Sequence, residues 1–153
     1  MVFQAPVTFP GTVADNLRTV RPDLDDDAAR AALGQVGLDT GLLDRPADAL
    51  SGGEAQRLVI ARALTTDPEV LLADEASSAL DAVATARLEE LARRLADAGM
   101  PLLWVTHDLE QARRLADQVL VMAEGRITWA GEPADPAAAP AVEAALRSGR
   151  DAS

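Results

Sequence analysis

The chain has 153 residues, of which 48% are apolar and 25% are charged, so it is long enough for one globular domain with a substantial core. It has no cysteine, which excludes disulfides and thiolate metal sites, and no apolar run near the ~18 residues that a membrane-spanning helix needs. The formal net charge is −11 and all 14 basic residues are arginine, a balance that argues against a nucleic-acid partner.

The first part of the chain is typical of helices joined by loops. Two prolines and a glycine interrupt residues 2–17, which predict a loop leading into a short helix near Ala14. Residues 21–38 predict a helix with acidic residues in its first turn and Gly37 near its end. The apolar stripe of this helix consists of Ala29, Leu33 and Val36. A polar loop marked by a proline continues to Ala49.

In the second part, strand and helix patterns alternate. A buried strand, an amphipathic helix, a second buried strand and a further helix are predicted in residues 69–75, 81–98, 101–108 and 109–117. Alternation around Glu124-Gly125 then predicts a hairpin over 118–131, and one more helix is expected at 139–146. This order predicts an α/β domain with a largely parallel sheet, in which ligands bind at the carboxyl ends of the strands.

Polar side chains stand where these strands end. Asp74 and Glu75 follow the first buried strand directly, and two adjacent carboxylates there are costly without a cation or another partner. His107, the single histidine, follows the second strand, where it is either structural or functional. Gln4 lies after Phe3 at the end of what reads as a short strand. Each of these signals is weak when it is taken alone.

A stretch rich in glycine precedes the helical run "AQRLVIARAL". The stretch "LSGGEAQR", residues 50–57, places a serine and two glycines at the start of that helix. It is either a simple loop-to-helix junction or a place where a phosphate approaches the backbone at a helix N-terminus.

Taken in order, these motifs resemble the ATP-binding cassette (ABC) ATPases, the motor subunits of ABC transporters. The resemblance runs from Val2 to about Ala130. It consists of a Q-loop glutamine at Gln4, the signature motif "LSGGEAQR", a Walker B strand "VLLADE" ending at Asp74-Glu75, a D-loop at Ser78–Asp81 and a switch histidine at His107.

The resemblance implies a fold and a division of the chain. We expect a P-loop NTPase-like α/β fold with a largely parallel sheet, flanking helices, a helical subdomain and a C-terminal hairpin. Residues 1–147 would form the partial ATPase domain, with the helical subdomain at about 5–50, the core at 51–130 and a tail at 131–147. Residues 148–153 would be a disordered end.

The resemblance also implies ATP and Mg²⁺ as cofactors. Glu75 would be the general base, and His107 would contact the γ-phosphate. Asp74 would hold Mg²⁺, and Gln4 would reach the metal and the attacking water. The expected nucleotide-binding residues, which act on the partner's ATP, are Ser51, Gly52, Gly53, Gln56 and Asp81.

The implied partners are a second ATPase subunit, arranged head to tail, and a transmembrane permease subunit. Residues 4–17 would form the surface that meets the permease, or else a plain loop braced by its prolines. The protein would then be cytoplasmic and peripheral, on the inner face of the cell membrane. No nucleic-acid partner is expected.

The chain departs from the family pattern in one large respect. It contains no G-x-x-x-x-G-K-[ST] motif and no lysine, so it resembles the C-terminal part of a cassette and should be inactive alone. Ala76 and Ser77 stand where the family usually has proline and threonine. Two alternatives remain: a non-catalytic cassette remnant that lends its signature motif to an intact partner, and a non-transport ABC protein.

Overall fold

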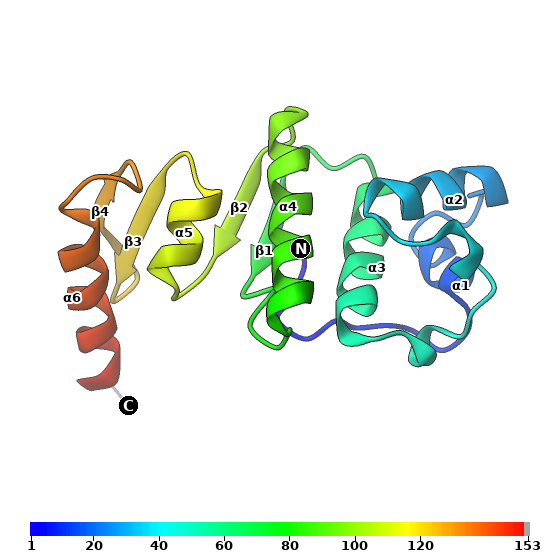
Figure 1. The fold of residues 1–153 in the computed structure, drawn as a ribbon, viewed down its shortest axis with the longest axis horizontal. Helices are drawn as coiled ribbons and strands as arrows, with labels where there is room; N and C mark the ends of the chain where they lie inside the picture. Colours follow the sequence, from blue (N-terminus) through cyan, green and yellow to red (C-terminus); the bar gives the residue numbers. More distant parts are fainter. Residues whose placement is uncertain (152–153) are drawn as a thin grey trace. The chain divides into compact units, whose positions relative to one another are not determined.

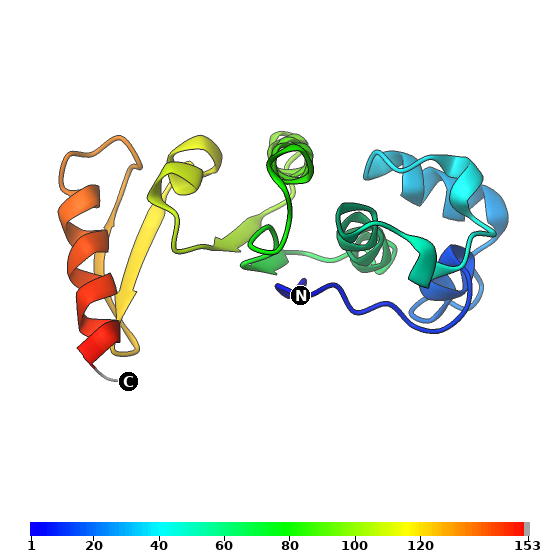
Figure 2. The same cartoon turned by 60° about the horizontal axis from the view of Figure 1, so that its bottom comes forward.

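A computed structural model describes residues 1–151, with the side chains of 146 and 148–151 left out. The chain forms two compact units, Met1–Val105 and Thr106–Ser153, which are treated separately below. The expected disordered end at 148–153 falls partly on residues 152 and 153, which lie outside the described residues. Figures 1 and 2 show the elements of each unit.

The first unit begins with short helical segments, and all but the last of them start at polar side-chain caps. They are α1 (Val13–Arg18), α2 (Asp26–Gln35) and two 3-10 turns, η1 (Thr40–Leu42) and η2 (Ala47–Ala49). Thr12 and Asp15 form a capping box on α1, and the Asp25 carboxylate accepts the Ala28 amide at the start of α2. Gly37 has φ +68° just beyond α2, in the left-handed region where glycine ends helices at low cost.

Helix α3 (Gly52–Leu64) is the centre of this unit and packs against α1, α2 and α4. Figures 1 and 2 both show it between the α1–α2 pair and α4. The apolar stripe predicted for residues 21–38 is confirmed, because Ala29, Leu33 and Val36 are fully buried. They share one core with Leu58 of α3.

The strands of the first unit run parallel. Strand β1 (Leu71–Asp74) pairs with β2 (Leu102–Val105), and helix α4 (Ala82–Asp97) connects them. Val2 adds a parallel bridge to Ala73 on β1, with the Val2 amide donating to the Leu72 carbonyl at 2.7 Å. Both strands and the connecting helix lie where the sequence predicts them.

One face of this small sheet is incompletely covered. Leu71 and Ala73 are 2% exposed because they face the core. By contrast, Leu103 and Val105 on β2 are 50% and 48% exposed, and Val70 before β1 is 48% exposed. The strands therefore bury alternate side chains only, as expected for a sheet packed on one side.

The second unit contains a hairpin and two helices. Helix α5 (Leu109–Leu115) is followed by strands β3 (Val119–Ala123) and β4 (Arg126–Gly131), which pair antiparallel. Glu124 and Gly125 have φ of 51° and 72°, the left-handed pair that a tight hairpin turn requires. Helix α6 (Ala138–Asp151) packs on both strands and is longer than the expected 139–146.

No helix among the described residues is both long enough and apolar enough to span a membrane.

Candidate functional site

Parallel pairing brings three of the predicted residues to one edge of the sheet. Asp74 ends β1, Glu75 follows it, and Gln4 lies two residues beyond the bridge that Val2 makes with β1. The Asp74 amide donates to the Val2 carbonyl at 2.9 Å, and the Glu75 amide donates to the Val105 carbonyl at 3.0 Å. The backbone therefore fixes the positions of both carboxylate residues from two sides.

Glu75 has an unusual backbone conformation. Its φ is +46°, in the left-handed region that a residue with a side chain rarely adopts. Neighbouring side chains point to opposite faces of a regular strand, so this turn ends the alternation directly after Asp74. Strain of this kind persists where the surrounding structure enforces it, and it is concentrated at functional sites. The turn is held by Ser78, whose amide and hydroxyl both donate to the Glu75 carbonyl.

His107 belongs to the second unit. It is exposed and lies two residues after the end of β2, just before Asp108 caps α5. The Asp108 carboxylate accepts the amides of Glu110 and Gln111, which fixes the start of that helix. The structure thus gives His107 its local setting, and its role toward a phosphate stays a prediction.

A second group of predicted residues surrounds the N-terminus of α3. Ser51 is the N-cap, and the two glycines that follow it are the first residues of the helix rather than a preceding loop. The Ser51 amide and hydroxyl donate to the Glu54 carboxylate at 2.8 and 2.7 Å, and the Glu54 amide donates back to the hydroxyl at 3.3 Å. This reciprocal capping box defines where the helix begins.

The two glycines differ in what surrounds them. A Cβ on Gly53 would lie 2.9 Å from the Ala84 Cβ, so glycine is needed there for close packing against α4. A Cβ on Gly52 would meet only the Leu80 side chain, at an ordinary 3.7 Å. Packing within this chain therefore explains Gly53, whereas Gly52 keeps its backbone open to an approaching ligand.

Gln56 corrects an expectation. Its side chain is fully buried, and its Nε2 donates to the Phe3 carbonyl at 3.0 Å, so it cannot contact a partner's nucleotide from this position. The signature motif predicts a ligand-binding role for Gln56, whereas its side chain contacts Phe3, 53 positions earlier in the chain. Gln56 therefore holds the backbone next to Gln4 instead of binding nucleotide.

Asp81 and Arg57 complete the surroundings of the α3 N-terminus. The Asp81 carboxylate caps α4 by accepting the Ala84 amide at 2.8 Å, a local role beside its expected one across a dimer. Arg57 is 8% exposed, and burial lowers the pKa of its guanidinium, with the nearby Arg87 acting in the same direction. No sequence pattern singles out Arg57, because its burial depends on how α3 packs against α4.

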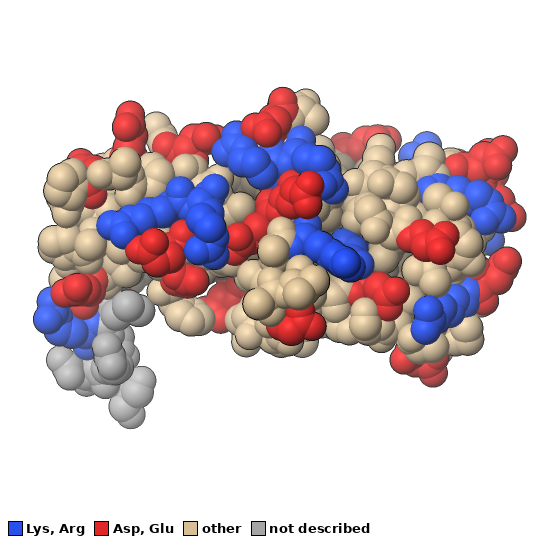
Figure 3. All heavy atoms as spheres, viewed as in Figure 1, with Lys and Arg blue, Asp and Glu red and all other residues tan. Residues whose placement is uncertain are grey.

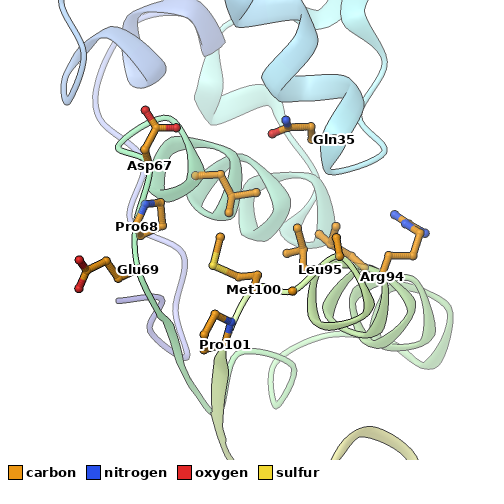
Figure 4. Close-up of a pocket in the computed structure, with 12 residues that line it drawn as sticks. Gln35, Asp67, Pro68, Glu69, Arg94, Leu95, Met100 and Pro101 are labelled. Atoms are coloured by element: carbon orange, nitrogen blue, oxygen red, sulfur yellow. The ribbon is translucent and has the colours of Figure 1, made fainter.

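A hollow of 630 Å³ lies at the other edge of the same sheet (Figure 4). Pro68 and Glu69 precede β1 there, Met100 and Pro101 precede β2, and Leu95 contributes from α4. In parallel sheets ligands bind at the carboxyl ends of the strands, so this hollow is not the candidate site.

Charges of both signs cover the face drawn in Figure 3, where arginines gather over α4 among scattered acidic side chains. On helix α4 itself, Arg93 pairs with Asp97 at 2.6 Å, and Arg94 pairs with Glu90 at 3.2 Å. The drawn face therefore presents mixed charge rather than a continuous basic stripe.

The strand-end carboxylates and the capped N-terminus of α3 lie where the sequence places a Walker B strand end and a signature motif. A family model described as ABC transporter matches residues 1–78, which is half of the chain. The chain belongs to this family.

Similar proteins support the assignment. The phosphate import ATP-binding protein PstB 2 of Mycobacterium tuberculosis is 40% identical over 141 residues, which cover 86% of this chain and 51% of that protein. The ABC transporter I family member 17 of Arabidopsis thaliana is 37% identical over 140 residues, covering 88% and 53%. The chain spans about half the length of these relatives.

A solved structure also resembles the chain. It is cbiO1 from Clostridium perfringens, part of the ABC transporter complex cbiONQ. The TM-score is 0.78 at 30% identity, and the likeness covers 98% of this chain and 64% of cbiO1. It confirms the predicted α/β fold of P-loop NTPase type.

Alanine substitutions at the two glycines should have different consequences. Gly53→Ala should lower the free energy of unfolding by about 1–3 kcal/mol, because its Cβ would clash with Ala84. Gly52→Ala should change it by less than about 1 kcal/mol, since alanine favours a helix and finds space. Urea unfolding of both variants measures this, and equal losses would contradict the assigned roles.

Acid should weaken the capping box of α3. Hydrogen bonds from the Ser51 hydroxyl and amide hold the pKa of Glu54 below its ordinary value of 4.5. A lowered carboxylate pKa contributes stability that is present above the ordinary value and is lost as the pH falls through the folded-state pKa. Glu54→Gln, which retains a capping partner, should therefore lose less stability than the unmodified chain between about pH 5 and pH 2. Urea titrations test this, with Glu69→Gln as the exposed control; parallel pH curves for Glu54→Gln and the unmodified chain would disprove it.

Proposed function

We propose that this chain is the signature-bearing part of an ABC transporter nucleotide-binding subunit, which couples ATP binding and hydrolysis to transport across a membrane. The observation that carries the proposal is the open helix N-terminus at Ser51 and Gly52, found in one chain with the strained carboxylate turn at Asp74-Glu75. Membership in the ABC transporter family supports it.

The residues at the strand ends, Asp74, Glu75 and Gln4, fit a nucleotide that carries Mg²⁺. Mg²⁺ prefers oxygen ligands and is usually held by one or two carboxylates together with substrate phosphates. Asp74 and Gln4 supply such oxygens at one sheet edge. Among the residues that the structure describes, no group of three or more His, Cys, Asp or Glu side chains is placed to hold a metal ion. When bound, Mg²⁺ would neutralise charge that develops on the transferred phosphoryl group.

Each of the predicted catalytic and metal-binding residues would have its own role in ATP hydrolysis. Asp74 would orient the metal, and Glu75 would accept a proton from the attacking water. Gln4 would hold that water in line, and His107 would donate a hydrogen bond to the γ-phosphate oxygens. These roles are inferred from the type of each residue and from its place in the family's motifs.

The helix N-terminus of α3 would act in trans. Ser51 and the amides near Gly52 would bind the γ-phosphate held by a second cassette, in a head-to-tail dimer. Asp81, which caps the adjacent α4, would lie in the same interface. The half-exposed apolar face that includes Leu103 and Val105 would be covered by the P-loop-bearing part of the cassette.

The loop before α1 would meet the membrane subunit. Val7 and Phe9 are 54% and 42% exposed there, an apolar surface suited to a short helix of a permease. This docking would place the protein at the cytoplasmic face of the membrane.

Replacement of the general base tests the function. A fusion that places the P-loop-bearing segment of a complete family member before residue 1 should hydrolyse ATP when Mg²⁺ is present. Glu75→Gln should lower kcat at least ~100-fold, because the base is lost while size and hydrogen-bonding reach are kept. ATP-driven dimerisation should persist in this variant. Phosphate release and light scattering measure the two effects, with Glu69→Gln as the control. Near-normal turnover of Glu75→Gln would remove Glu75 from its role.

The 153-residue chain without a P-loop segment should not turn over ATP. Its predicted residues act on a phosphate that is already positioned, and positioning contributes ~7–11 kcal/mol of the barrier in well-oriented reactions. Calorimetry should detect no micromolar ATP binding, and phosphate release over hours should stay at the background of a heat-denatured sample. Steady turnover would show that other residues build the nucleotide site.

A further inference from the structure

Helix α3 holds the backbone of the amino-terminal segment at two places. Gln56 Nε2 donates to the Phe3 carbonyl at 3.0 Å, and Arg62 Nη2 donates to the Val7 carbonyl at 2.8 Å. The arginine also lies over the Phe9 ring, with Cζ 4.7 Å from the centroid. Phe3–Phe9, here called the tethered segment, is therefore fastened to the helix that begins with the signature motif.

The segment is long enough to reach both anchors. Gln56 and Arg62 are six positions apart, which is about 9 Å along a helix axis. Phe3 and Val7 are four positions apart, which is at most about 14 Å of extended chain. Figures 1 and 2 both show the amino-terminal segment running past α3 to α1.

Asn16 extends the second anchor into α1. Its side chain is fully buried, accepts the Phe9 amide at 2.8 Å and donates to the Phe9 carbonyl at 2.9 Å. Arg62 Nη1 donates to the same Asn16 oxygen at 3.3 Å. The exposed tip of the segment, Val7 and Phe9, thus rests on a hydrogen-bonded support rather than on apolar packing alone.

The hydrogen bond from Gln56 to Phe3 contributes more to the position of the segment than to the stability of the fold. The oxygen of the same Gln56 amide, Oε1, is buried without a hydrogen-bond partner. A buried unsatisfied acceptor destabilises a fold, so this glutamine gains little net stability from its single bond to Phe3. What the bond does provide is a fixed distance between α3 and the residue before Gln4.

We propose that Gln56 and Arg62 are positioning residues that make the tethered segment and the signature helix move as one body. This inference rests on the proposed function, since it links Gln4 and the docking tip in the segment to Ser51 at the start of α3. A force applied at Val7 or Phe9 then reaches the helix N-terminus directly, through charged and amide hydrogen bonds.

Hydrogen exchange on the 153-residue chain tests the tethers without reference to activity. Arg62→Gln should speed exchange of the Phe9 amide about tenfold, because its acceptor Asn16 loses a charged support. Arg62→Lys, which keeps the charge, should restore part of the protection. Arg94→Gln, which removes an exposed ion pair on α4, is the matched control and should leave Phe9 unchanged.

Gln56→Leu should speed exchange of the Asp74 amide, which donates to Val2 beside the first anchor, while the urea midpoint stays nearly constant. Unchanged exchange at Phe9 and Asp74 would overturn the proposal. A uniform acceleration that includes Leu88 and Leu91 in α4 would overturn it as well, since that pattern reports general destabilisation.

The fusion with a P-loop-bearing segment then tests whether the tethers affect ATP hydrolysis. Arg62→Gln should lower kcat about tenfold and leave the KM for ATP within about twofold, and Arg62→Lys should recover part of kcat. An unchanged kcat in an active fusion would overturn the linkage. An inactive unmodified fusion would instead contradict the proposed function, and the exchange measurements would still decide the tethers.

Discussion

The burial of helix α3 on all sides is the constraint on which the first unit depends. Seven consecutive residues, 55–61, are buried, so no face of the middle of this helix is left to solvent. A helix of this kind must be enclosed by other elements, here α1, α2 and α4. Its polar members, Gln56 and Arg57, are enclosed with the rest. Because the N-terminus of such a helix cannot shift without disturbing the core, Ser51 and Gly52 are held in place by packing far from them.

Periodicity was enough to predict most of the elements. The helix over 81–98 and the two buried strands were predictable because each pattern reports a local choice between core and solvent. Leu88 and Leu91 of α4 are 1% exposed, as expected for the apolar face of an amphipathic helix. The strand ends at Asp74 and Glu75 were predictable for the same reason, since a short apolar run that stops at charge leaves few alternatives.

The tethers were not predictable, because they depend on contacts across long stretches of sequence. Asn16 and Arg62 look like ordinary surface residues of two helices, yet 46 residues separate them and a hydrogen bond joins them. Gln56 was misassigned for the opposite reason: its motif is associated with phosphate, and motif position does not show which way a helix turns its side chains. A buried polar group is found only once the elements around it are placed.

The adjacent carboxylates illustrate how backbone and chemistry depend on each other. In a continuing strand Asp74 and Glu75 would project to opposite faces, and one of them would enter the apolar core at high cost. The left-handed turn at Glu75 avoids this outcome and is itself unfavourable, by an amount of order 1–3 kcal/mol. Hydrogen bonds from Ser78 to the Glu75 carbonyl and from the Glu75 amide to Val105 offset that cost. Asp67 and Glu124 adopt the same conformation away from this site, so the conformation alone assigns no role. The proposed role of Glu75 rests on its place directly after Asp74 at the end of β1.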